Sequence, residues 1–209
     1  YVQEFEKIDL SNIATVGGKN ASLGEMIQKL TAKGIQIPNG YVVNANAYWD
    51  FIAYNTLKQP LIQKLKKLDT DQFSNLRSIG KSCREMIMAG EIPIAIQTDI
   101  ITQFELLKDR YQKAIEVAVR SSATAEDLPQ ASFAGQQESY LNIQTDKELI
   151  DACHKCYASL FTDRAIKYRS DNGFEHMDVA LSIGVQKMVR SDKAYAGVCF
   201  TIDPETGFE

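Results

Sequence analysis

The amino-acid sequence predicts an α+β fold, in which helices and strands occupy different stretches of the chain. Segments with helical apolar spacing dominate residues 1–115, whereas β-rich segments gather in residues 116–209. The chain has 209 residues, of which 44% are hydrophobic, so it can bury one good core. It shows neither an internal repeat nor a low-complexity linker, and we treat 1–209 as one structural unit.

A glycine turn opens the first expected helix. Gly17 and Gly18 precede Lys19, and apolar residues then recur at helical spacing, namely Leu23, Met26, Ile27 and Leu30. Helix N-termini carry unpaired N–H groups and a partial positive charge, so a phosphate is stabilised there, and a lysine adds a mobile charge. The segment lacks the spacing of a P-loop and does not follow a strand with GxGxxG, so both of those nucleotide folds are disfavoured.

Further helices are expected as scaffold at 44–55, around 60–68, at about 71–89 and at 97–114, with Pro38, Pro60 and Pro93 marking breaks. The aromatic residues of the first of these segments suggest two alternatives, a platform for an adenine ring or a core role. Their helical spacing favours a core or domain-contact role for Tyr48, Trp49, Phe51 and Tyr54.

Residues 117–142 have the composition of a phosphate pocket. Val117 and Val119 predict a short half-buried strand that delivers Arg120 to its carboxyl end. The hydroxyl groups of Ser121, Ser122 and Thr124 follow, and Gly135 lets backbone N–H groups approach an anion because it has no Cβ. Taken alone, the same residues also fit a strand followed by an ordinary polar loop with an ion-paired arginine, and this alternative stays open.

The four cysteines suggest a metal site, a disulfide or simple core packing. In the expected helix that starts near Asp146 as N-cap, Cys153 and Cys156 fall on the apolar stripe. Cys83 and Cys199 stand alone in a helix-like and a strand-like segment, without a second CxxC or HxxxH to complete four ligands. We therefore expect reduced core cysteines and no metal ligands in this chain.

The last part of the chain is β-rich. Residues 179–189 and 194–203 favour strands, and the turn Arg190-Ser191-Asp192-Lys193 joins them, so we expect an antiparallel hairpin. The formal net charge of −4 argues against a general nucleic-acid surface. No apolar run approaches the ~20 residues that span a bilayer, and the start YVQEFEKIDL lacks a signal-peptide core, so we expect no membrane partner and a cytoplasmic location.

Three segments of the chain carry a resemblance to a known family. They are GGKNASLGEM at 17–26, VRSSATAEDLPQASFAGQQESYLN at 119–142, and ALSIGVQKMVRSDKAYAGVCFTIDPETGFE from 180 to the end. Together they resemble the amino-terminal ATP-binding domain of the family of phosphoenolpyruvate synthase (pyruvate, water dikinase), pyruvate phosphate dikinase and rifampicin phosphotransferase. Within this family, QKMVRSD at 186–192 and the SFAGQQES loop are closer to the synthases than to the phosphate dikinases.

The resemblance implies the first, N-terminal half of an ATP-grasp-like nucleotide-binding domain, with ATP as its ligand. Lys19 matches the lysine that contacts the ATP phosphates, and Arg120 matches the arginine that holds the polyphosphate tail. Gly135 matches the glycine of the loop that closes over the phosphates, and Ser139 stands where relatives often have threonine. Gln186 matches a residue lining the nucleotide pocket.

The resemblance also implies parts that these residues do not supply. Relatives bind Mg²⁺ and phosphate with an acidic residue and a Gln-x-Arg segment beyond position 209, carry a phosphorylatable histidine in a swivelling domain, and bind pyruvate in a barrel. Neither His154 nor His176 lies in a segment like that histidine motif. The chain is thus expected to be a catalytically incomplete part of a longer enzyme that makes phosphoenolpyruvate, AMP and phosphate. A related dikinase, a rifampicin phosphotransferase or a non-catalytic nucleotide-binding domain stays open as an alternative.

Overall fold

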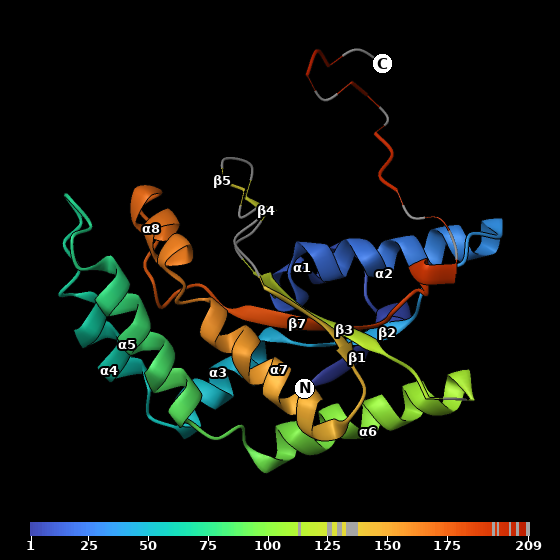
Figure 1. Ribbon diagram of the computed structural model, residues 1–209, viewed down its shortest axis with the longest axis horizontal. Coiled ribbons are helices and arrows are strands. Elements are labelled where there is room, and N and C mark those ends of the chain that lie inside the picture. The colour runs from blue at the N-terminus through green and yellow to red at the C-terminus, as the bar shows by residue number, and fades with distance from the viewer. Residues whose placement is uncertain are drawn as a thin grey trace.

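A five-stranded antiparallel sheet lies at the centre of the computed structural model of this chain (Figure 1). The structure describes residues 1–112, 114–124, 127–128, 131–132, 138–193, 195, 197–200, 202–203 and 205–207. The strand order is β1-β2-β7-β3-β6, with the bounds β1 (Val2–Glu4), β2 (Gly40–Val43), β3 (Val117–Ala123), β6 (Ser139–Ile143) and β7 (Leu181–Lys187). β4 (Asp127–Leu128) and β5 (Ala131–Ser132) pair separately. The predicted mixture of helices and strands in an α+β fold is confirmed.

The central strand β7 sets the register of the sheet. Gly40 of β2 pairs with Gln186 on one side of β7, and Arg120 of β3 pairs with Gly184 on the other. Ser122 of β3 likewise pairs with Ser182. Residues opposite each other in an antiparallel pair point to the same face, and so do residues two apart in one strand. The arginine, the two serines and the glutamine therefore share one face of the sheet.

That face is covered by α1 (Ile13–Val16) and α2 (Gly18–Leu30), together with the short 3₁₀ turns η1 (Phe5–Lys7), η2 (Leu10–Asn12) and η3 (Thr31–Lys33) (Figure 1). A small apolar cluster lies between them and the sheet, made of Phe5, Ile8, Val16, Ala21, Ile27 and Val42. Gly24 belongs to the same buried side of α2, because an added Cβ would lie 2.3 Å from the Ile8 carbonyl oxygen.

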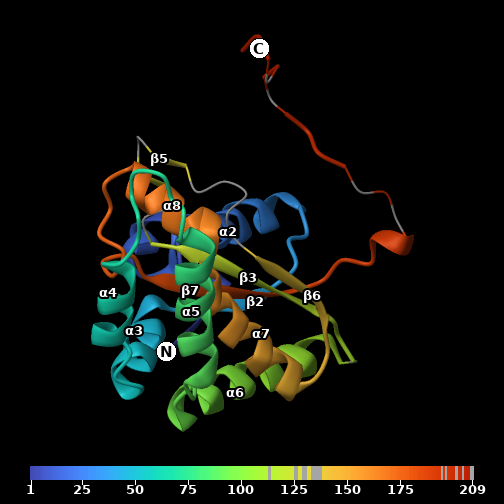
Figure 2. The same ribbon diagram turned by 60° about the vertical axis from the view of Figure 1, so that its left-hand side comes forward.

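The opposite face carries the larger core. The helices of this layer are α3 (Ala45–Tyr54), α4 (Lys58–Leu65), α5 (Leu76–Ala89), α6 (Ile94–Tyr111), α7 (Asp146–Ser159) and α8 (Asp163–Asp171). Figures 1 and 2 show α3, α6 and α7 nearest the sheet, with α4 and α5 outside them. Tyr48 and Phe51 are buried here against Tyr157, which confirms a core role for them, whereas Tyr54 is exposed.

The predicted helices exist, but several ends differ from the prediction. The helix expected from 71 begins at Leu76, because the Asp69 carboxylate accepts hydrogen bonds from the backbone N–H groups of Asp71, Gln72 and Ser74 and holds them in a loop. Pro60 does not break a helix: it is the third residue of α4, within the first turn, where a backbone N–H has no intrahelical acceptor.

The cysteine-containing helix α7 is confirmed, with a different cap. Thr145, not Asp146, is the N-cap, and its side chain accepts from the Glu148 backbone N–H in a capping box. Cys153 and Cys156 are fully buried free thiols, as predicted. Burial raises the pKa of the Cys153 thiol to about 12, which disfavours the thiolate that a metal or an electrophile would need.

The predicted hairpin of 179–189 and 194–203 is wrong. Only its first half is a strand, β7, and both edges of β7 are already paired, with β2 and with β3. The second half therefore finds no free edge there. The residues described after Lys193 form no strand, and in both views they run away from the sheet (Figures 1 and 2). Cys199 is exposed in this segment.

Candidate functional site

A cavity of about 400 Å³ lies between the first turns of α2 and the neighbouring strands β3 and β7. Three predicted site residues line it together: Lys19, Arg120 and Gln186. The other lining residues are Phe5, Gly18, Asn20, Ser22, Leu23, Met26, Ser121 and Gly184. The described lining residues thus contribute two cationic side chains and no carboxylate, a combination that suits an anionic ligand.

Lys19 reaches the cavity from the first turn of α2. Gly17 caps this helix with φ +72° and ψ 158°, a conformation that is essentially restricted to glycine. The chain turns sharply there, so α1 and α2 are separate helices and the first N–H groups of α2 have no acceptor within the helix. The side chain of Lys19 is exposed. The predicted glycine turn followed by a helix is confirmed.

Arg120 and Gln186 reach the same cavity from the sheet. Arg120 lies in the middle of β3 and not at its carboxyl end, because the strand continues through Ser121, Ser122 and Ala123. Its side chain is exposed, although its strand neighbours on both sides are buried. Gln186 is half-buried, and its Nε2 donates to the Pro38 carbonyl oxygen at 2.9 Å, which fixes the amide against the chain before β2.

The remaining predicted residues lie elsewhere or outside the described residues. Ser139 pairs with Arg120 across β3 and β6, yet it is not among the residues that line the cavity. Gly135 lies outside the described residues. Of the three expected hydroxyl donors, Ser121 lines the cavity, Ser122 is buried beneath Gly17, and Thr124 bonds the Ala180 carbonyl oxygen.

Several lining residues escaped the sequence prediction. Leu23 and Met26 were assigned to the apolar stripe of the helix, but they line the cavity, and Met26 is 43% exposed. The buried residues of α2 are Gly18, Asn20, Ala21, Gly24 and Ile27, of which the predicted stripe contained Ile27. The small residues Ala21 and Gly24 were the available signal, since a helix with small side chains can approach neighbouring backbone closely, as Gly24 does at the Ile8 carbonyl oxygen. The cavity therefore has an apolar wall beside its two cations.

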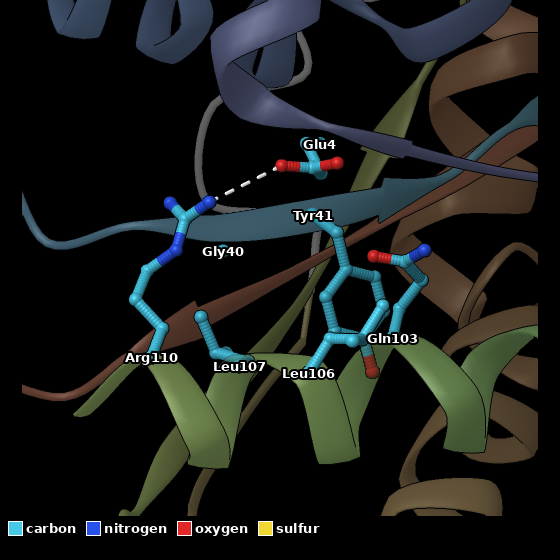
Figure 3. Close-up of a pocket in the computed structure, with 7 residues that line it drawn as sticks. All are labelled: Glu4, Gly40, Tyr41, Gln103, Leu106, Leu107 and Arg110. Atoms are coloured by element: carbon cyan, nitrogen blue, oxygen red, sulfur yellow. Dashed lines mark hydrogen bonds and ion pairs between the residues drawn. The ribbon is translucent and has the colours of Figure 1, made fainter. Parts of the chain in front are cut away.

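Two other cavities are less suited to an anion. The first, of about 210 Å³, lies between β1, β2 and α6 and contains Arg110 (Figure 3). The guanidinium of Arg110 is already paired with Glu4 at 3.3 Å and with Glu6 at 2.8 Å. The second, of about 460 Å³, is lined by two lysines of α4 and its flank but also by Glu175 and Asp178. Carboxylates therefore offset the cations in both.

No metal site accompanies the candidate cavity in the part of the chain that the structure describes. Groups of three or more His, Cys, Asp or Glu side chains able to hold a metal ion are absent from those residues. Within the same residues, none of the helices has the length and apolar character needed to cross a bilayer.

Comparison with known proteins shows the family of this chain. Residues 13–209 match the family model described as "Pyruvate phosphate dikinase, AMP/ATP-binding domain". A phosphoenolpyruvate synthase of Synechocystis sp. is 51% identical over 98% of this chain, one of Helicobacter pylori is 49% identical over 100%, and one of Aquifex aeolicus is 50% identical over 98%. The chain covers 26%, 26% and 24% of these three proteins, so it spans about a quarter of their length. With the family match covering nearly all of its residues, the chain belongs to the AMP/ATP-binding domain family of pyruvate phosphate dikinase.

Proposed function

We propose that the cavity between α2, β3 and β7 binds the phosphate groups of ATP, and that the chain is the ATP-binding lobe of a phosphoenolpyruvate synthase. One observation carries this proposal: Lys19 at a helix N-terminus and Arg120 in a strand about a hundred residues later line one cavity. The lysine is a mobile point charge and the guanidinium is a planar fork, and phosphate groups accept hydrogen bonds from both. The relatives named phosphoenolpyruvate synthase, about 50% identical, support the assignment.

In the proposed reaction, ATP, pyruvate and water give AMP, phosphoenolpyruvate and phosphate through a phosphohistidine. The histidine would belong to another part of the protein, because neither histidine of this chain lines the cavity. His154 Nε2 lies 2.7 Å from the Ile87 carbonyl oxygen, and His176 accepts from Arg169. Lys19 and Arg120 would offset the charge that develops on the transferring phosphoryl group and hold it in place. Pyruvate would bind only in the longer protein.

Mg²⁺ fits the proposed reaction but not the residues of this cavity. The charged groups among its described lining residues are an ammonium and a guanidinium, which repel a divalent cation, and Mg²⁺ prefers carboxylate and phosphate oxygens. We therefore propose that the ion arrives with ATP and is held mainly by residues outside this chain. The half-domain of ATP-grasp type that the resemblance implies would provide them. Gly135 and Ser139 would also contact the phosphates, as the resemblance implies.

The test compares alanine variants of the full-length protein. Hydrogen bonds to charged groups contribute about 1.5–3 kcal/mol, so Arg120→Ala should lower kcat/KM for ATP by roughly ten- to 150-fold. Ser139→Ala removes a neutral hydroxyl and should cost about tenfold or less. Lys29→Ala is the matched control, because Lys29 lies on α2 but pairs with Glu25 away from the cavity. Equal activity of Arg120→Ala and Lys29→Ala would show that this cavity is not the ATP site.

A further inference from the structure

The turn that carries Lys19 is tied to the sheet by two buried polar side chains. Asn20 is 5% exposed, and its Nδ2 donates to the Val16 carbonyl oxygen and to the Ser182 hydroxyl, both at 3.0 Å. Ser182 is fully buried on β7. Its hydroxyl lies within hydrogen-bonding distance of the Val16 carbonyl oxygen, and 3.1 Å from that of Ser122 on β3. One serine hydroxyl thus meets the end of α1, the start of α2 and the strand β3.

Two glycines let the backbone approach this contact closely. A Cβ on Gly184 would lie 2.3 Å from Asn20 Oδ1, so the asparagine amide rests directly on the bare backbone of β7. A Cβ on Gly17 would lie 2.3 Å from Ser122 Oγ, so the turn itself rests on β3. Gly184 is also the residue that pairs with Arg120. The contact that seats Lys19 and the strand position that presents Arg120 are therefore adjacent.

We infer that Asn20 and Ser182, which we name the Asn20–Ser182 clamp, are positioning residues that set the distance between the Lys19 ammonium and the Arg120 guanidinium. The clamp acts through Lys19: Asn20 is the next residue in the chain, and Ser182 and Ser122 form one register pair two residues from the pair of Gly184 and Arg120. A phosphate chain that contacts both cations needs them at one separation, and small displacements of positioned groups lower binding and rate. This inference rests on the proposed ATP site.

The experiment compares clamp variants of the full-length protein with a matched control. Ser182→Ala removes the hydroxyl, whereas Ser182→Thr keeps it. Asn20→Asp keeps the side-chain size but removes both donated hydrogen bonds, and it gives a second reading if Ser182→Ala does not fold. The control is Thr15→Ala, because the Thr15 hydroxyl bonds the Asn12 carbonyl oxygen on the exposed side of α1. Two readouts are measured: steady-state kinetics, and amide hydrogen exchange without nucleotide.

We expect Ser182→Ala and Asn20→Asp to raise KM for MgATP about three- to tenfold, with a smaller change in KM for pyruvate. Amide exchange should become faster in a peptide covering 13–23 and stay unchanged in α7. Ser182→Thr should restore the KM for MgATP and the exchange rate of peptide 13–23 to within about twofold of the parent values. The inference is overturned if the clamp variants match Thr15→Ala in both readouts. Amide exchange is measured without nucleotide, so it tests the clamp even if the protein does not use ATP. A protein that does not use ATP would refute the proposed function but not the clamp.

Discussion

Arg169 shows how a single buried charge shapes its neighbours. The residue is fully buried in α8; its Nη2 donates to the Leu160 carbonyl oxygen at 2.5 Å and its Nε to His176 Nδ1 at 3.1 Å. Burial lowers the pKa of Arg169 to about 10, so the guanidinium stays charged at neutral pH. Burial, and then the charge of Arg169, lower the pKa of His176 to about 4. His176 is therefore neutral when it accepts this hydrogen bond.

This pair predicts a loss of stability in mild acid. In the unfolded chain His176 titrates near its ordinary pKa of 6.5, and in the folded chain near 4, so the unfolded chain binds more protons between these values. The free energy of unfolding should fall as pH falls through this window and be unaffected above it. Because the His176 side chain is partly exposed, we expect the free energy of unfolding to be lower at pH 5 than at pH 7 by about 1–2 kcal/mol.

Urea unfolding at pH 7 and pH 5 measures this loss. His176→Asn keeps a hydrogen-bond acceptor but does not titrate, so the variant should lose less stability between the two pH values than the parent chain. Parallel losses in the two proteins would mean that His176 does not cause the acid sensitivity.

Single site residues could be predicted where a local pattern determines their place. Lys19 follows a glycine turn and precedes a helical pattern, and Arg120 follows alternating valines, so both positions were visible in the sequence. The Asn20–Ser182 clamp was not, because its hydrogen bond joins residues 162 positions apart. Nothing local distinguishes Ser182 from any other serine in a strand. The contacts of Lys19, Arg120, Gly135, Ser139 and Gln186 with ATP stay predictions.

Among the elements, the turn between α1 and α2 is the one whose geometry depends on a single residue. Gly17 has φ +72° and ψ 158°, and an added Cβ would meet Ser122 Oγ at 2.3 Å. Gly34 has a similar φ of +84° in an ordinary left-handed conformation, with open space where a Cβ would stand. Gly17 therefore combines a conformation restricted to glycine with a steric contact, whereas Gly34 has only a left-handed backbone.

We expect Gly34→Ala to cost about 1 kcal/mol of unfolding free energy and Gly17→Ala to cost at least about 3 kcal/mol. The second variant should also displace Lys19 and weaken nucleotide binding, whereas the first should not. Thermal unfolding and MgATP titration of both variants in the same buffer give the comparison. Similar destabilisation of the two would show that the turn can move off β3 at little cost.

The elements themselves were predictable to different degrees. Apolar periodicity located the long helices, but their ends depended on side chains that accept hydrogen bonds from the backbone, such as Asp69 in the loop before α5 and the cap Thr145 of α7. The strand β2 went unnoticed because four residues are too few for a periodic signal. The prediction of a hairpin was wrong because a sequence pattern shows that a segment favours a strand, but not which strand edge is free to pair with it. Both edges of β7 are already paired.

For the whole molecule, the described lining of the cavity combines two cationic side chains with the apolar side chains of Phe5, Leu23 and Met26. The relatives are about four times longer than this chain, so the residues that complete a nucleotide site have room to lie outside it. The α+β class followed from the order of patterns along the chain. The site as a whole could not be predicted, because it assembles from α2, β3 and β7, which lie far apart in the chain.

The 209-residue chain should bind MgATP far more weakly than the full-length protein. Losing ~3 kcal/mol of contacts, those that we propose the rest of the protein supplies to the site, weakens binding by about 150-fold. Calorimetric titration of both proteins under the same conditions measures the difference. Similar dissociation constants would show that this chain carries a complete site by itself.

The position of β7 also determines the order in which the molecule can form. The pair β1-β2 is joined to the pair β3-β6 by β7, which lies between them in the sheet. β7 comes after all four of these strands in the chain. As the chain emerges during synthesis, its helices can form early, but the two half-sheets keep open edges until residues 181–187 appear. Ser182, Gly184 and Gln186 arrive with that strand, so the cavity forms in the same step that closes the sheet. At the proposed site, a nucleotide can therefore stabilise this chain only after the sheet has closed.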